Sequence, residues 1–189
     1  MDNEGSSALL LEDRLYYITE KLEINSNQAL KNIIIARAYN SDHLVQIIKE
    51  ASAVIKEKNI KLLIVDGLIS HFMSEYRGLN DETDDLEIQV ENLFIVNATI
   101  RSLLSDLQKL AKDYNLIVVF TYAERFVRES GLGNPFKPVG GTVLAQENHT
   151  RIYLEKGKGD VRIAHLVHSP TLSLGFAEFY FSDYGIIDS

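Results

Sequence analysis

A single carboxylate, Asp66, closes an apolar run in this sequence. The residues before it, Leu62–Val65, are all apolar, which is typical of a strand buried on both faces of a parallel sheet. Such a strand brings the next side chain to the carboxyl edge of the sheet, where open α/β folds bind ligands. There a carboxylate can hold the water shell of a nucleotide-bound Mg²⁺, as a Walker B residue does. An Asp that simply closes a strand is the alternative interpretation.

The phosphate cradle that should accompany such a carboxylate is missing from the sequence. No G-x-x-x-x-G-K-[ST] motif occurs. Residues 156–160, K-G-K-G-D, are glycine-rich, but they join two expected strands and do not open a helix, as a phosphate-binding loop must. The His residues show no paired helical spacing for a metal, and no G-x-S-x-G elbow marks a Ser nucleophile.

Residues 122–138 form a second candidate site, because they combine cations and aromatic rings without any periodicity. Cations can follow a phosphate backbone while rings stack on bases, so the segment suits single-stranded nucleic acid. A solvated loop is an equally good interpretation. The residues concerned are Arg125, Arg128, Lys137, Phe126 and Phe136.

Composition limits the possible classes of protein. A length of 189 residues suits one domain over residues 1–189, and 46% hydrophobic with 24% charged residues indicates a globular chain. Cys is absent, which excludes disulfides, Cys-based zinc sites and Cys nucleophiles. The net charge of −8 argues against a generally basic nucleic-acid surface. No run is long and apolar enough for a membrane span, and residues 1–7 are polar, so a cytoplasmic protein is expected.

Helical and strand patterns alternate in the first two thirds of the chain, and strands cluster at the end. This order predicts an α/β fold with a twisted, mostly parallel sheet flanked by helices, extended by carboxy-terminal antiparallel strands. Residues 40–42, N-S-D, are good caps for the second helix. The expected helices are 11–22, 44–55 and 93–114. The expected strands are 32–36, 62–65, 116–121, 151–155, 161–167 and 176–181.

Several short motifs of this chain follow one another in the order in which a known family has them. Residues 36–43 read A-R-A-Y-N-S-D-H, and residues 61–78 read K-L-L-I-V-D-G-L-I-S-H-F-M-S-E-Y-R-G. Further on come P-V-G-G at 138–141, R-I-Y-L-E-K-G-K-G at 151–159, S-P at 169–170 and G-I-I-D at 185–188. Together these motifs resemble the ATPase core of the RecA/RadA recombinase family, from about residue 11 to residue 189.

The resemblance implies an ATP-dependent filament on single-stranded DNA that carries out homologous pairing and strand exchange. It implies ATP and Mg²⁺ as cofactors, with the nucleotide held between protomers. Asp66 would be the Walker B carboxylate and would act on Mg²⁺ through water. Glu4 would activate the attacking water, and Pro170 would belong to the cap over a neighbour's ATP.

The same resemblance implies contacts with DNA and with a recombinase protomer. Two loops of the family face DNA and correspond here to residues 77–91 and 122–138. The residues expected to bind DNA are Arg77, Arg125, Arg128, Lys137, Gly140 and Gly141. The surface expected to receive a segment of a neighbouring protomer consists of Arg37, Ala38, Tyr39, Leu44 and Ile48.

The chain also departs from the family pattern. It lacks the amino-terminal domain, the linker with its F-x-x-A motif and the Walker A loop. Gly67 stands where the family usually has Ser, Ala123 where it has Gln, and His168 where it has Asp. The first DNA loop is acidic instead of basic, and carboxylates oppose phosphates. Its acidic residues are Asp81, Glu82, Asp84, Asp85, Glu87 and Glu91.

These departures leave two versions of the function open. In the first, the chain is a degenerate paralogue that docks on a true recombinase and has no ATPase activity alone. In the second, it is a split half or fragment of a strand-exchange recombinase, completed by a separate P-loop segment. The lost Gln and Asp, together with the acidic loop, favour the first version, since a split half would be expected to keep those chemical groups. An inactive remnant without a partner is the third possibility.

Overall fold

The computed structural model describes residues 4–76, 86–126, 136–138, 143–144, 149–183 and 185–188. Contacts divide the chain into two compact units. Unit 1 combines Met1–Ile35 with Asn148–Ser189, and unit 2 is Ala36–Glu147. The single domain expected for residues 1–189 stays a prediction.

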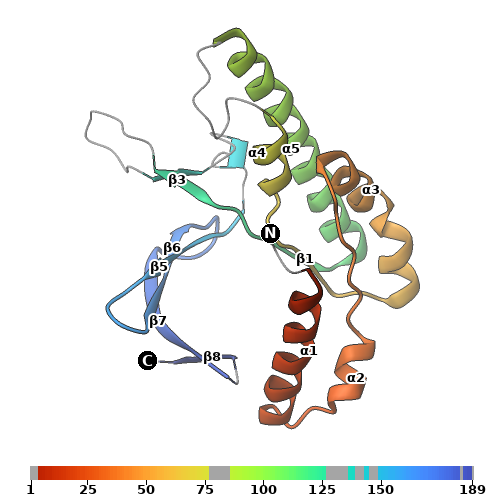
Figure 1. Cartoon of the computed structure of the whole chain (residues 1–189), viewed down its shortest axis with the longest axis vertical. Coiled ribbons are helices and arrows are strands. Elements are labelled where there is room, and N and C mark those ends of the chain that lie inside the picture. Colours follow the sequence, from red (N-terminus) through yellow and green to blue (C-terminus); the bar gives the residue numbers. More distant parts are fainter. Residues whose placement is uncertain are drawn as a thin grey trace. The chain divides into compact units, whose positions relative to one another are not determined.

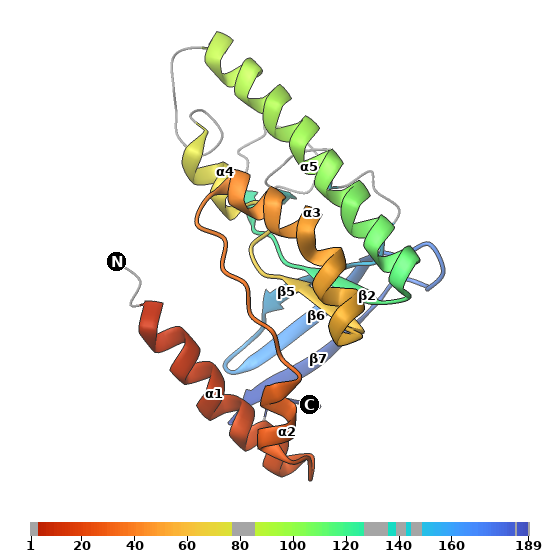
Figure 2. The ribbon, with the colours of Figure 1, turned by 90° about the vertical axis from the view of Figure 1, so that its right-hand side faces the viewer.

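Unit 2 contains a short parallel sheet and the helices that cover one of its faces (Figure 1). Strands β1 (Leu62–Val65) and β2 (Ile117–Phe120) pair in parallel, from Leu62 opposite Ile117 to Val65 opposite Phe120. Helices α3 (Ser41–Lys58) and α5 (Leu86–Tyr114) lie side by side (Figure 2), and the short α4 (Ser70–Glu75) follows β1. Strands β3 (Glu124–Phe126) and β4 (Phe136–Pro138) form an antiparallel ribbon.

The buried core of unit 2 lies between these helices and one face of the sheet. Amphipathic α3 and α5 supply most of it, as their three- and four-residue spacing predicts. Asn40 caps α3 as expected, since the His43 backbone N–H donates to Asn40 Oδ1 at 2.7 Å. The core side chains are Leu44, Ile48, Ile55, Val65, Leu68, Ile69, Phe72, Val96, Ile100, Leu103, Leu104, Leu107, Leu110, Leu116, Val143 and Leu144.

The other face of the parallel sheet is exposed, so the expectation of strands buried on both faces was wrong. Its side chains are Leu62 (50% exposed), Ile64 (60%), Ile117 (66%) and Val119 (45%). The register brings these four residues together on one side of the sheet. We call this surface the bare face. An apolar run predicts a strand, but it does not specify what covers each side.

The strand expected at residues 32–36 is also absent. Residues 33–38 have no assigned secondary structure, and Ile33, Ile34 and Ile35 are exposed. A strand exists only when a neighbour pairs with its backbone N–H and C=O groups, and apolar composition cannot supply that neighbour. The long helix α5, in contrast, begins at Leu86, seven residues before the expected Leu93. Glu87 lies in its first turn, where the helix dipole favours a carboxylate.

Unit 1 contains two helices and a four-stranded antiparallel sheet of order β5-β6-β7-β8. The hairpin of β5 (Arg151–Lys156) and β6 (Val161–His168) confirms the turn expected at residues 156–160, although Lys156 still belongs to β5, and β7 (Gly175–Ser182) confirms the third strand. The sequence patterns missed the four-residue β8 (Gly185–Asp188) and the six-residue α2 (Ser26–Lys31). Helix α1 (Glu4–Lys21) begins earlier than expected.

The architecture of the described residues is therefore α/β, but among them the parallel sheet has two strands and the larger sheet is antiparallel. Among the helices of the described residues, none combines the length and the apolarity that a membrane crossing requires.

Candidate functional site

Asp66 lies directly after β1 and is exposed, beside the residue that follows β2. That residue, Thr121, donates its hydroxyl hydrogen to Asp66 Oδ1 at 2.5 Å and accepts the Gly67 backbone N–H at 2.8 Å. The backbone N–H of Leu68 donates to Thr121 O at 2.9 Å, and the Thr121 N–H donates to Val65 O at 3.0 Å. Thr121 thus fixes both the Asp66 carboxylate and the turn that carries it.

The turn also explains why glycine occupies position 67. Gly67 has a φ of +72°, a conformation that side chains with a Cβ adopt at a cost. A Cβ there would lie 2.7 Å from Ser70 Oγ. The backbone geometry at position 67 therefore suits the glycine of this chain better than the serine that the family usually has there.

We predict that Gly67→Ser lowers the free energy of unfolding by about 1–2 kcal/mol, because it combines left-handed backbone strain with a close contact. Chemical denaturation followed by circular dichroism measures this. Two controls separate the causes. Gly159→Ser has a similar φ of +67° without neighbouring atoms, so it should show the strain alone. Gly175→Ser has neither feature and should change stability by less than about 0.5 kcal/mol. Equal effects in all three variants would contradict the argument.

The chemistry available at Asp66 is limited. One carboxylate can contact a Mg²⁺ ion through its water shell, which Mg²⁺ gives up reluctantly. Within the described residues no group of three or more His, Cys, Asp or Glu could hold a metal directly. Thr121 uses its hydroxyl hydrogen on Asp66, and its hydroxyl oxygen accepts from Gly67. These residues fit a second-sphere contact to Mg²⁺, but they offer no cradle for the phosphates of ATP.

The segment expected to bind a recombinase protomer divides into exposed and buried residues. Tyr39 is exposed and stacks on His43 with ring centroids 5.5 Å apart, while the Arg37 guanidinium lies 5.6 Å from the Tyr39 ring centroid. Leu44 and Ile48 are buried in the core of unit 2, and Ala38 packs against it. A partner can therefore reach Arg37 and Tyr39. Leu44 and Ile48 are buried beneath this surface and would not contact a partner directly.

The N-terminus of α3, beside this surface, carries a contact that sequence patterns missed. The Ser41 backbone N–H donates to Glu75 Oε1 at 2.9 Å, and the Ser41 hydroxyl donates to Glu75 Oε2. Glu75 belongs to α4 and is 34 residues away in the chain, so no local pattern could reveal the pair. A carboxylate at a helix N-terminus is stabilising. This pair ties α4 to the start of α3.

Some of the expected DNA-binding residues can be placed by their backbone. Arg125 lies opposite Lys137 in the β3–β4 ribbon, and Phe126 lies opposite Phe136. The segment 122–138, expected to be irregular, therefore contains a ribbon with two cationic residues in register. Arg77, Arg128, Gly140 and Gly141 lie outside the described residues, and so do residues 77–85 of the acidic loop expected at 77–91. The rest of that expected loop was wrong, because Glu87 and Glu91 lie in helix α5.

Two expected nucleotide-site residues lie in unit 1. Glu4 is the first residue of α1, and Pro170 is exposed after β6. His168 ends β6, and its Nδ1 lies 2.8 Å from His149 O. A carbonyl oxygen can only accept, so Nδ1 carries the hydrogen. An aspartate in the position of His168 could not donate this bond, unless it were protonated. Histidine in place of the family's aspartate at position 168 therefore makes a hydrogen bond that an ionised aspartate could not make.

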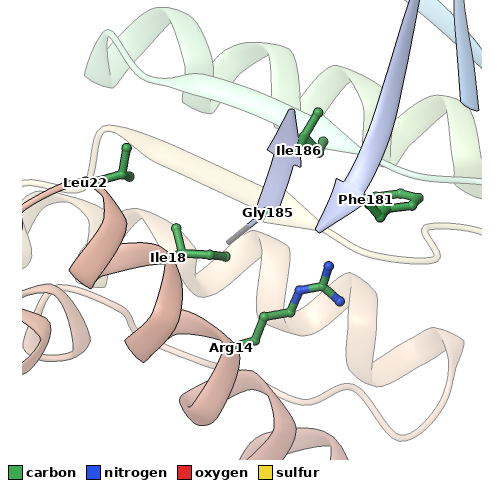
Figure 3. Close-up of a pocket in the computed structure, with 6 residues that line it drawn as sticks. All are labelled: Arg14, Ile18, Leu22, Phe181, Gly185 and Ile186. Carbon is green, nitrogen blue, oxygen red and sulfur yellow. The ribbon is translucent and has the colours of Figure 1, made fainter. Parts of the chain in front are cut away.

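A cavity of about 560 Å³ lies between α1 and the β7–β8 hairpin (Figure 3). Arg14 donates to Ser182 O at 3.4 Å across one end. Gly185 has a φ of +106°, and a Cβ there would lie 3.7 Å from Ile18 Cγ1. No sequence pattern predicts this cavity, because its walls come from segments that are distant in the chain. They consist of Arg14, Ile18, Leu22, Phe181, Gly185 and Ile186.

Comparison with known proteins gives concordant results. A family model described as Rad51 matches residues 2–189. The DNA repair and recombination protein RadA of Ignicoccus hospitalis is 34% identical over 188 residues, which cover 100% of this chain and 53% of that protein. The chain thus spans about half the length of this curated relative.

Proposed function

The chain belongs to the Rad51 family, and from that premise we propose that it acts in DNA recombination and repair as a core that binds a recombinase protomer and does not hydrolyse ATP alone. The bare face carries this proposal. Parallel sheets occur almost only with both faces covered. Here four apolar side chains on one side of β1 and β2 are exposed. Another protein surface that covers them would complete the fold.

The geometry at Asp66 supports the second half of the proposal. Phosphoryl transfer depends on positioning the phosphates and neutralising their charge. Asp66 and Thr121 can contact the water shell of Mg²⁺, but a phosphate cradle and its Lys are absent from the sequence. Ala123 has no side-chain amide, and His168 has no carboxylate, so two further groups of the family pattern are changed. ATP and Mg²⁺ would bind only with groups that a partner supplies.

The alternative is a split half or fragment of a strand-exchange recombinase, completed by a separate P-loop segment. The bare face also favours this version, because a P-loop segment could cover it. The twisted, mostly parallel sheet that the resemblance implies would then form only in the completed state. In either version, single-stranded DNA would meet Arg125 and Lys137 of the β3–β4 ribbon.

We expect Tyr39→Ala to weaken binding to the full-length recombinase of the same organism about tenfold or more, since Tyr39 is an exposed aromatic residue of the kind that anchors interfaces. Calorimetric titration measures this. Tyr16→Ala, a substitution of another exposed tyrosine in unit 1, is the control and should bind like the unaltered chain. Equal affinity of the Tyr39→Ala variant would rule out this surface as the interface.

ATPase assays of the chain, alone and mixed with the recombinase, distinguish the two versions of the function. The chain alone should hydrolyse no ATP above the buffer rate. A paralogue should bind the recombinase without adding ATPase sites. A split half should gain ATPase activity, stimulated by single-stranded DNA, when a P-loop polypeptide is added. ATPase activity of the chain alone would overturn both versions.

A further inference from the structure

The antiparallel sheet of unit 1 carries three aromatic rings in a row. Tyr153 of β5 lies opposite His165 of β6, which lies opposite Phe176 of β7. Directly opposite residues project from the same face of a sheet. The ring centroids of Tyr153 and His165 are 6.1 Å apart, and those of His165 and Phe176 are 6.0 Å apart. We call these three residues the ring row; β5, β6 and β7 lie side by side (Figure 2).

Two carboxylates stand beside the ring row on the same face. The next row across the strands is Glu155, Ile163 and Glu178. Glu155 Oε2 lies 3.0 Å from His165 Nε2, and half of the Glu155 side chain is exposed. Glu178 is exposed as well. The face is thus aromatic and acidic.

Two of the three Lys and Arg residues of these strands lie on the opposite face. Lys156 pairs with Arg162, and Arg162 with Phe179, in the alternate register positions. The Arg162 guanidinium lies 5.8 Å from the Phe181 ring, which belongs to that opposite face. The third cation of these strands, Arg151, lies on the side of the ring row. It stands at the start of β5, where the register shifts. Within β5, β6 and β7 the carboxylates thus lie on the face of the ring row, and two of the three cations lie on the opposite face, where β8 adds Asp188.

A purely structural role does not account for the ring row. Aromatic cross-strand pairs stabilise sheets, but such a role would bury the outermost ring, and Phe176 is 70% exposed. A row of rings on a sheet can also stack nucleic-acid bases. The neighbouring Glu155 and Glu178 would repel the phosphates, in a chain whose net charge is already −8. A ligand for this face should therefore be a cation that can also stack on an aromatic ring.

We propose that this face binds an arginine side chain of a partner protein. A guanidinium is planar, so it can stack on the Phe176 ring while its N–H groups donate to Glu155 and Glu178. Lysine offers a point charge without the planar stacking surface. The proposal rests on unit 1 alone and depends neither on the Asp66 turn nor on Tyr39, so it can hold or fail independently of the proposed function.

The test uses the full chain and three peptides that differ in one side chain. The probe is acetyl-Gly-Arg-Gly-amide, compared with the same peptide carrying lysine or citrulline. Titrations followed by aromatic and amide nuclear magnetic resonance should show millimolar-range binding of the arginine peptide. Binding of the lysine peptide should be several-fold weaker, and that of the uncharged citrulline peptide should be lost. The signals that shift should include those of Phe176 and His165.

Substitutions then assign the contacts. Phe176→Ala and Glu155→Gln should each weaken binding of the arginine peptide about tenfold. Ile152→Ala is the control, because Ile152 is 61% exposed on the opposite face of the same sheet. It should leave the affinity unchanged. Phe176→Leu keeps an apolar side chain without a ring, and it should also weaken binding, so the test survives if the alanine variant fails to fold.

Two results would overturn the proposal. One is equal binding of the arginine and citrulline peptides, which would mean that the carboxylates do not contribute. The other is a larger response of the ring signals to a fifteen-residue deoxythymidine oligonucleotide, at roughly the peptide's concentration, which would identify the ring row as a base-stacking surface.

Discussion

Replacing Phe72 by alanine is expected to lower the free energy of unfolding of unit 2 by about 3–5 kcal/mol. Phe72 is 1% exposed and lies in α4, which follows the Asp66 turn. A six-residue helix is too short to be stable by itself, so its buried side chains hold it in place. Losing the Phe72 side chain would also weaken the placement of Glu75 in the same helix. The Glu75 carboxylate accepts a hydrogen bond from the Ser41 backbone N–H at the start of α3. Chemical denaturation measures the loss.

Phe94→Ala is the matched control for this prediction. Phe94 lies in α5 and is 75% exposed, so its truncation should cost less than about 1 kcal/mol. Similar losses for the two variants would show that the core does not lie where α3, α4 and α5 meet. A loss at Phe72 of less than about 1 kcal/mol would lead to the same conclusion.

Local patterns predicted those parts of the fold whose stability comes from nearby residues. The apolar spacing of α3 and α5, the Asn40 cap and the turn between β5 and β6 each depend on a few neighbouring residues. The strand expected at 32–36 failed for the opposite reason. Its three isoleucines fit a strand, but pairing requires a distant partner that composition does not specify.

The candidate site shows the same division. The sequence predicted that Asp66 would follow a strand, and the structure confirms its place after β1. The sequence could not show that Thr121, from the end of β2, bonds to this carboxylate, because the register of two strands decides it. The Ser41–Glu75 pair and the ring row likewise arise from register and packing. Roles for Glu4, Pro170 and the DNA-binding residues stay predictions.

The bare face leads to the second large expected effect. Ile64→Thr combined with Ile117→Thr should change the free energy of unfolding of the free chain by less than about 1 kcal/mol, since both side chains are exposed and threonine keeps the strand preference. The same double variant should lose about ten- to a hundredfold in affinity for the full-length recombinase. Burying an isoleucine side chain contributes about 1.5–3 kcal/mol, and 1.4 kcal/mol corresponds to tenfold. Calorimetric titration measures the affinity.

A second pair of exposed residues provides the control for the bare face. Ile152→Thr with Leu154→Thr removes apolar area of similar exposure from the antiparallel sheet, and it should leave the affinity for the recombinase unchanged. If both double variants bind equally weakly, the loss reflects general surface hydrophobicity and not a specific interface. If the Ile64→Thr and Ile117→Thr variant binds like the unaltered chain, no partner covers the bare face. Completion of the fold by another protein would then be excluded at this surface, because the exposed side chains of β1 and β2 are what such a protein would cover.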